Sequence, residues 1–258
     1  MPHCLAGLVM IFWGSDRKYL TIRFGALRRE MDVLTKTEIR ELAFKLDFSD
    51  VGFTTAAPFA EQKEILLARR EMHAWVEKQG LDLLAGTDPA TIMPEAKSII
   101  VLLDNYCRTS YPSSLTGKFG RCYLDDDRIT RDGLSRRIKT FIAQLQTHGV
   151  RVKASFNLPH RLAAARAGVG NFGKNCLLYA NRTARGSSWV IPVAIITDKE
   201  FEPDQPTLEV GCPSWCRNAC IIACPTGALT APRTIDPRRC ISYLTYLGEG
   251  LPPPALRE

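Results

Sequence analysis

The sequence has no apolar run near its start that is long enough to cross a membrane. The run from Cys4 to Trp13 is about half of the ~20 residues that a spanning helix needs. It also lacks the basic stretch before it and the small-residue cleavage site after it that mark a secretory signal. We therefore predict a cytoplasmic protein with no membrane partner.

Internal repeats and low-complexity tracts are also absent from the sequence. Hydrophobic residues make up 45% of the chain and charged residues 24%, which is typical of a folded globular protein and not of a disordered one. Residues 1–30 are the exception. Because Met31 directly precedes a helix-like segment, we expect these residues to be a tail or sequence translated from a misassigned start.

The formal charge of +7 is not gathered into one basic stripe. Lys and Arg are scattered along the chain, and several Arg pairs fall in helix-like stretches. A solvated surface explains this pattern better than a dedicated nucleic-acid site.

Hydrophobic periodicity predicts an α/β layered fold over residues 31–200. The expected helices are 37–48, 61–78, 134–146 and 158–167, the last ended by Gly168, and the expected strands are 98–103, 150–156 and 189–197, with Pro192 at an edge or bulge and a long loop over 107–128. Beyond residue 200 the composition shifts to Pro, Gly and Cys. We expect residues 201–258 to form a small second domain.

Nine cysteines are many for a chain of this kind, and five of them lie between residues 212 and 240. Such crowding favours metal ligation over disulfides. The other four are isolated in the sequence, and we expect them to be small buried hydrophobic residues: Cys4, Cys107, Cys122 and Cys176.

Four of the clustered cysteines are equally spaced: Cys212, Cys216, Cys220 and Cys224. Pro225 and Thr226-Gly-Ala follow the last one. Soft iron prefers thiolates, and the common 4Fe–4S run is C-x2-C-x2-C-x3-C-P, whereas this chain has three residues in every gap. The alternative is a Cys4 zinc site, whose separated C-x2-C knuckles are not present here. The spacing and the Cys-Pro ending predict a 4Fe–4S cluster.

Cys240 is the fifth cysteine of this region. Two 4Fe–4S clusters need about eight thiolates, and the region offers five. We therefore expect one cluster, with Cys224 or Cys240 as the fourth ligand, or else a chain that is a shortened version of a longer protein.

Five segments together resemble the epoxyqueuosine reductase family of cobalamin and iron–sulfur enzymes. They are Ala96–Ile100 with Asn105-Tyr106 downstream, Ala165–Asn175 (ARAGVGNFGKN), Ile196-Thr-Asp198, Ala223–Ala228 (ACPTGA) and Arg239–Thr245 (RCISYLT).

The resemblance implies a corrinoid-binding α/β domain followed by a ferredoxin-like domain with 4Fe–4S clusters. It also implies electron transfer through the clusters to cobalamin, reduction of a queuosine precursor in tRNA, and an electron donor such as a ferredoxin or flavodoxin. The residues that it places at the cofactors are Asn105, Tyr106, Gly168, Gly170, Gly173, Lys174 and Asn175 for cobalamin, and Cys212, Cys216, Cys220, Cys224 and Cys240 for iron.

The chain departs from the family in places. An acidic proton donor is expected in an Asp-x-x-Pro-x-x-Glu stretch before residue 165, but residues 155–161 read SFNLPHR. An Asp-Tyr-His motif is replaced by residues 125–130 (DDDRIT), and a second cluster motif and a helical-repeat domain are not in the sequence. His160 is the candidate replacement proton donor because an ordinary histidine pKa of ~6.5 suits that task. A capping or core histidine is the alternative.

The glycines of Gly168-x-Gly170-x-x-Gly173 also match the dinucleotide-binding fingerprint. That fingerprint follows a strand and has an acidic residue about 20 positions later. Here it follows a helix-like segment and lacks the acid, so a tight loop against the corrin fits the resemblance better.

Two other functions remain open from the sequence. One is a non-catalytic electron carrier that serves a partner protein, and the other is a zinc-stabilised binding module. The bound metal distinguishes them, because a cluster protein is brown and a zinc protein is colourless.

Overall fold

The computed structural model describes residues 34–78, 80–107, 112–118, 121–123 and 133–242. All of them belong to a compact unit that begins at Asp32. The expectations for the first 30 residues, for Cys4 and for residues 125–130 lie outside the described residues. Among the described residues, no helix is both long enough and apolar enough to cross a membrane.

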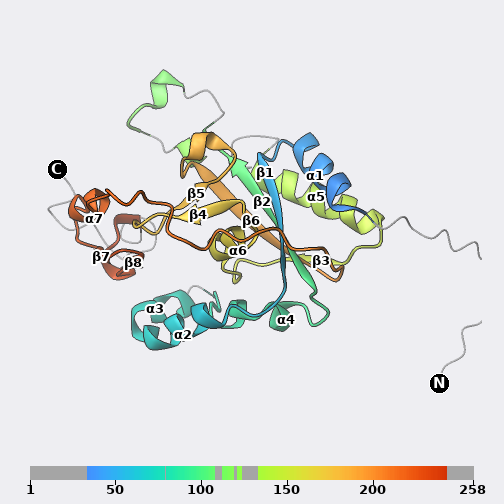
Figure 1. The fold of residues 1–258 in the computed structure, drawn as a ribbon, viewed down its shortest axis with the longest axis horizontal. Helices are drawn as coiled ribbons and strands as arrows, with labels where there is room; N and C mark the ends of the chain where they lie inside the picture. The colour runs from blue at the N-terminus through green and yellow to red at the C-terminus, as the bar shows by residue number, and fades with distance from the viewer. Residues whose placement is uncertain (1–33, 79, 108–111, 119–120, 124–132, 243–258) are drawn as a thin grey trace, which may run out of the picture. The chain divides into compact units, whose positions relative to one another are not determined.

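A four-stranded antiparallel sheet forms the centre of this unit (Figure 1). Its strands lie in the order β1 (Asp50–Thr55), β2 (Ser98–Asn105), β6 (Val190–Thr197) and β3 (Val152–Ala154). The expected mixture of helices and strands is confirmed. Because neighbouring strands run antiparallel, however, the helices do not complete parallel β-α-β units.

Side chains that alternate along β2 enter two separate cores. Ile99, Val101 and Leu103 contribute to one core, and Ile100 and Leu102 to the other. All five are fully buried, as the continuous apolar run predicts for a strand covered on both faces.

Helices cover both faces of the sheet (Figure 1). Helices α1 (Lys36–Lys45) and α5 (Leu134–Thr147) pack on the face of Ile100. The opposite face holds α6 (His160–Arg166) and the hairpin of β4 (Gly170–Phe172) and β5 (Leu178–Ala180).

Local sequence explains where α1 begins. Thr35 and Glu38 form a capping box, in which the Thr35 hydroxyl accepts the Glu38 N–H at 3.2 Å and the Glu38 carboxylate accepts the Thr35 N–H at 2.8 Å. Two donors that would otherwise be unpaired at the helix start are thereby satisfied.

The prediction of a single helix over residues 61–78 is wrong in one respect. The segment forms two helices, α2 (Ala60–Ala68) and α3 (Arg70–Lys78), because Arg69 leaves the helical conformation with φ −118° and ψ 24°. No glycine or proline marks this break in the sequence, so the helical prediction ran across it.

The strand expected over residues 150–156 is shorter, and β3 pairs with β6 only as far as Ile195. Pro192 therefore lies beyond the end of β3, on a part of β6 that only β2 flanks by strand pairing. This agrees with the edge position expected for that proline.

The remaining described elements are short. They are α4 (Pro89–Ile92), α7 (Ala219–Ile222), β7 (Leu229–Ala231), β8 (Thr234–Ile235) and the 3-10 helices Ala85–Thr87, Ser113–Leu115, Arg121–Tyr123, Ala184–Gly186 and Pro237–Arg239.

Candidate metal centre

The cysteine segment begins beside the β4–β5 hairpin. Phe172, the last residue of β4, forms a parallel bridge with Val210, and its carbonyl accepts the Gly211 N–H at 2.9 Å. A side chain at Gly211 would collide with Asn171, since an added Cβ would lie 1.8 Å from the Asn171 Oδ1. The hairpin therefore places the chain immediately before Cys212.

Lys174 connects the hairpin loop to two of the expected iron ligands. Its backbone N–H donates to the Cys212 Sγ at 3.3 Å, and its Nζ donates to the Cys216 carbonyl at 3.1 Å. The Lys174 carbonyl accepts the Arg233 N–H at 2.9 Å. The structure thus brings together a residue expected at the cobalamin and residues expected at the iron.

Backbone donors also surround Cys224. The Leu229 N–H is the main cause that lowers the pKa of the Cys224 thiol; burial opposes it, and the Thr226 hydroxyl and the Ala228 N–H reinforce it. A lowered pKa favours the thiolate, which is the form that binds metal.

The five clustered cysteines are all free and partly buried: Cys212, Cys216, Cys220, Cys224 and Cys240. Within the described part of the chain, no three His, Cys, Asp or Glu side chains are gathered as a metal site. The fit to an iron–sulfur cluster therefore rests on the donors themselves: soft thiols, free of disulfides, with N–H groups directed at two of the sulfurs.

The expectation that the isolated cysteines are buried is wrong for the three that the structure describes. Cys122 is exposed, and Cys107 and Cys176 are half-buried. Their flanking residues gave no periodic signal that would have shown this. Cys176 lies in the β4–β5 loop, two residues after Lys174.

The three motif glycines are required by internal packing. Gly168 ends α6 with φ +68°, and an added Cβ would lie 2.2 Å from the Gln205 carbonyl oxygen. At Gly170 it would lie 2.9 Å from the Leu178 side chain, and at Gly173 2.5 Å from the Tyr179 ring. The chain's own atoms thus occupy the space that each glycine leaves open.

The other residues expected at cobalamin have local partners. The Asn105 Oδ1 accepts the Cys107 N–H at 3.0 Å, and the Asn175 Nδ2 donates to the Tyr179 Oη at 2.9 Å. Burial raises the pKa of the half-buried Tyr106. Among the hydrogen bonds of the described residues, none joins Asn105 or Tyr106 to the loop around Lys174, so these contacts leave the two groups separate.

His160 is held by backbone groups on both sides of its ring. Its Nδ1 accepts the Ala194 N–H at 2.8 Å, so its Nε2 carries the proton and donates to the Ser155 carbonyl at 3.0 Å. Burial lowers the pKa of the ring, and the Ser155 carbonyl partly opposes the shift. These contacts are those of a structural histidine, which was the alternative to a proton donor.

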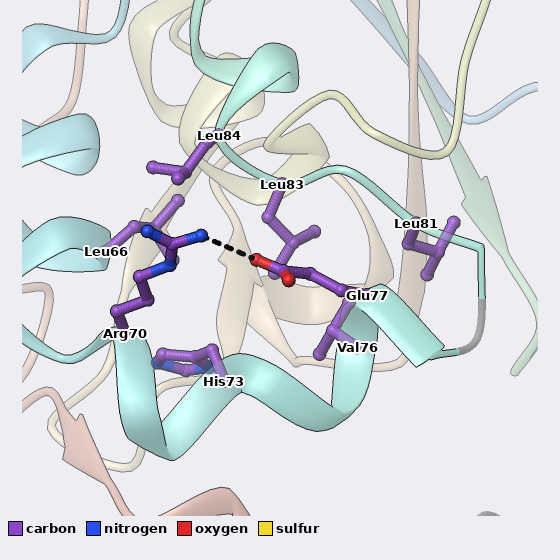
Figure 2. A pocket seen from close by; sticks show the side chains of 8 residues that line it. All are labelled: Leu66, Arg70, His73, Val76, Glu77, Leu81, Leu83 and Leu84. Atoms are coloured by element: carbon purple, nitrogen blue, oxygen red, sulfur yellow. Dashed lines mark ion pairs between the residues drawn. The ribbon is translucent and has the colours of Figure 1, made fainter.

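A hollow lies between α3 and the segment that follows it, with Leu66 of α2 also in its lining, away from the clustered cysteines in sequence (Figure 2). Arg70 and Glu77 form an exposed ion pair across it at 3.9 Å. Burial lowers the pKa of His73, which is part of its lining. The lining is mostly leucine and valine, and it supplies no set of convergent ligands among Leu66, Arg70, His73, Val76, Glu77, Leu81, Leu83 and Leu84.

No protein-family model matches the chain. Comparison with individual proteins gives clear relatives. Epoxyqueuosine reductase of Listeria monocytogenes is 34% identical over 235 residues, which cover 81% of this chain and 56% of that protein. The chain thus spans little more than half the length of the relatives it matches.

Solved structures of epoxyqueuosine reductases are also similar to this chain. Epoxyqueuosine reductase of Bacillus subtilis superposes with a TM-score of 0.64 at 30% identity, over 81% of this chain and 56% of that one. A structure of an epoxyqueuosine reductase with an epoxyqueuosine-modified tRNA-Tyr stem loop gives a TM-score of 0.63 at 31% identity, with the same coverage of both chains.

Proposed function

The chain is a homologue of the epoxyqueuosine reductases over 81% of its length, and we propose that it is an iron–sulfur oxidoreductase that reduces a queuosine precursor in tRNA. The observation that carries this proposal is the cysteine segment: it follows the homologous α/β region and is hydrogen-bonded to the β4–β5 loop through Lys174. The chemistry of soft thiol donors supports iron as the metal.

Within this proposal each residue has a distinct task. A 4Fe–4S cluster would be held by Cys212, Cys216, Cys220 and Cys224, with Cys240 as the alternative fourth ligand. When bound, the cluster supplies one-electron transfer. The Lys174 N–H stabilises negative charge on the Cys212 sulfur, and the Leu229 N–H does so on Cys224. Such donors tune a cluster's potential and protect its thiolates.

The overall reaction on an epoxide precursor takes two electrons and two protons and releases the oxygen as water. A soluble donor such as a ferredoxin or flavodoxin would supply the electrons. His160 as proton donor stays a prediction, and its two backbone partners favour a different role, in which it positions the loop from Ser155 to Pro159.

Cobalamin is the second cofactor of the proposal, and its support is the motif resemblance around Gly168–Asn175. The three glycines do not leave a free surface against which a corrin could lie, because Gln205, Leu178 and Tyr179 fill the space beside them. Titration with cobalamin, followed by absorption and electron paramagnetic resonance, tests this part separately. Spectra identical to those of the free cofactor would remove cobalamin from the proposal.

The decisive experiment combines cofactor content with turnover. Protein purified without oxygen should be brown, with broad absorption near about 400 nm from thiolate-to-iron charge transfer. It should convert an epoxyqueuosine-containing tRNA stem loop when supplied with reductant. The Cys212→Ser variant should lose colour and turnover together, while Cys122→Ser, at an exposed isolated cysteine, should keep both.

Other outcomes identify the rival functions. A brown protein that transfers electrons to a redox partner but never converts the stem loop is an electron carrier. A colourless protein with one zinc per chain is a zinc-stabilised binding module. Either result contradicts the proposed reductase.

A further inference from the structure

Lys174 uses each of its polar groups to contact residues of the cysteine region. Its N–H donates to the Cys212 Sγ at 3.3 Å, and its Nζ donates to the Cys216 carbonyl at 3.1 Å. Its own carbonyl accepts the Arg233 N–H at 2.9 Å. A single residue of the α/β part of the sequence therefore connects two of the expected iron ligands to the β4–β5 loop.

The turn between Cys212 and Cys216 has little packing to hold it. Residues 213–215 are exposed, and Trp215 is 80% exposed. The Cys216 N–H bonds the Pro213 carbonyl at 3.0 Å, which closes the turn only on itself. Among the hydrogen bonds of the described residues, the two that Lys174 donates are those that join residues 212–216 to another part of the chain.

The loop that carries Lys174 is itself well fixed. The Gly173 N–H and the Leu177 carbonyl close it at 2.9 Å, and the Tyr179 ring packs directly beside Gly173, where an added Cβ would lie 2.5 Å from it. Lys174 is half-buried, so its long side chain has less freedom than a surface lysine. The loop thus gives the ammonium a fixed base from which to reach Cys216.

The ammonium of Lys174 brings a positive charge as well as a hydrogen bond. A charged donor bonds a carbonyl more strongly than a neutral one does. An iron–sulfur cluster gains negative charge on reduction, so a positive charge held nearby favours the reduced form and raises the reduction potential. The side chain of Lys174 is therefore placed to affect both the position of a ligand and the potential of the metal group.

We propose that Lys174 is a positioning residue for the metal centre: its ammonium holds Cys216 in place beside Cys212 and keeps a positive charge next to the bound cluster. This inference rests on the proposed function, because it requires that the chain bind a cluster. It assigns the side chain of Lys174 to the cysteines, whereas the motif resemblance placed this residue at cobalamin.

The test compares Lys174→Met, Lys174→Arg and Lys153→Met in the full chain. All three substitutions leave the backbone contacts of residue 174 available. Lys153 is the matched control, because its Nζ also donates to a backbone carbonyl, that of Ile92 at 3.0 Å, but makes no contact with the cysteines. Lys153→Met thus removes the same kind of bond and the same charge elsewhere.

Each protein is reconstituted without oxygen, iron release to a chelator is followed by absorbance, and the reduction potential is measured by titration with electron paramagnetic resonance. We expect Lys174→Met to release iron at least about tenfold faster than the unmodified protein. Its potential should shift to more negative values. Lys174→Arg, which keeps the charge, should lie closer to the unmodified protein in both measurements, and Lys153→Met should match it.

A further measurement uses the iron-free chain. Hydrogen exchange followed by mass spectrometry should show faster exchange of residues 212–216 in Lys174→Met than in Lys153→Met or the unmodified protein. Unchanged iron release, an unchanged potential or unchanged exchange in Lys174→Met, or equal effects in Lys174→Met and Lys153→Met, would each overturn the inference. Unmodified protein that takes up no iron would instead defeat the proposed function, while the exchange measurement would still decide whether Lys174 holds the turn.

Discussion

The Ala194 N–H donates a hydrogen bond of 2.8 Å to the Nδ1 of His160, directly beyond the last residue pair of β3 and β6. The other ring nitrogen reaches the carbonyl of Ser155, the residue that follows β3. The imidazole therefore bridges the two strands where their own ladder has stopped. It satisfies a backbone donor on a strand that is otherwise open on that side.

This arrangement makes stability depend on the neutral ring of His160. Burial lowers its pKa in the folded chain, so below the ordinary value of about 6.5 the unfolded chain binds the proton more readily. The contribution is complete above pH 6.5 and falls as the pH decreases toward the folded-state pKa, by at most about 1.4 kcal/mol per pH unit. Urea unfolding between pH 5 and 8 measures this dependence.

The matched variants are His160→Gln and His148→Gln. Glutamine retains a donor and an acceptor at position 160 but does not titrate, so the slope below pH 6.5 should become shallower. His148 is exposed at the end of α5, and its replacement should leave the slope unchanged. Equal slopes for all three proteins would show that His160 is not the titrating group.

Asp204 should contribute to stability against acid. Burial by itself would raise its pKa, but hydrogen bonds from the Lys36 Nζ at 2.6 Å and the Phe53 N–H at 2.9 Å, together with Arg40, hold the pKa below its ordinary value. This contribution is present above pH ~4 and is lost as the pH falls through the folded-state pKa. Asp204→Asn should lower the free energy of unfolding at pH 7 by about 1–2 kcal/mol.

A surface carboxylate provides the control for Asp204. Glu77 is 58% exposed and lies 3.9 Å from Arg70, so Glu77→Gln should change stability by less than about 0.5 kcal/mol. Guanidinium unfolding at pH 7 and pH 3 should separate the two variants at neutral pH and bring Asp204→Asn closer to the unmodified protein in acid. A constant difference at both pH values would contradict the ionic explanation.

Gly168 and Gly186 separate backbone strain from steric collision. Both have positive φ, +68° and +67°, but an added Cβ at Gly168 lies 2.2 Å from the Gln205 carbonyl oxygen, whereas at Gly186 its nearest neighbour is at 3.8 Å. Gly186→Ala should cost about 1–2 kcal/mol for the left-handed conformation alone. Gly168→Ala should lower the free energy of unfolding by at least about 2 kcal/mol more than Gly186→Ala. The colliding atom is the backbone carbonyl oxygen of Gln205, which cannot move away by a side-chain rotation. If thermal unfolding shows the same loss of stability in both variants, the collision at Gly168 is refuted.

The iron content of the chain should not exceed one cluster. The clustered region offers five thiols, fewer than the eight that two 4Fe–4S clusters need. Anaerobic reconstitution followed by iron and sulfide analysis should give about four irons per chain. A stable content of about eight would contradict this prediction.

The sequence revealed the elements whose side chains carry a strong periodic signal. Strands β2 and β6 were predicted from their apolar runs, and α5 from its helical spacing. Strand β1 was missed, because its six residues include Gly52 and have no alternation that separates them from a loop. The antiparallel pairing was also outside the reach of local patterns, since it depends on contacts between segments far apart in the sequence.

The sequence predicts the donors of the candidate site, which stay a prediction, but it does not predict their surroundings. The clustered cysteines stood out by spacing, but the contact of Lys174 with Cys212 depends on how the hairpin packs. For His160 the residue type suggested a proton donor, whereas its two backbone partners indicate a structural role.

The place of β2 in the sheet also determines how the protein should fold and open. Leu102 pairs with Val51 on one side and with Val193 on the other, so β2 pairs on both sides with strands that are far from it in the sequence. Such non-local pairing slows folding to roughly the millisecond-to-second range. The amide protons of β2, paired on both sides and covered on both faces, should exchange with solvent only when the whole sheet unfolds.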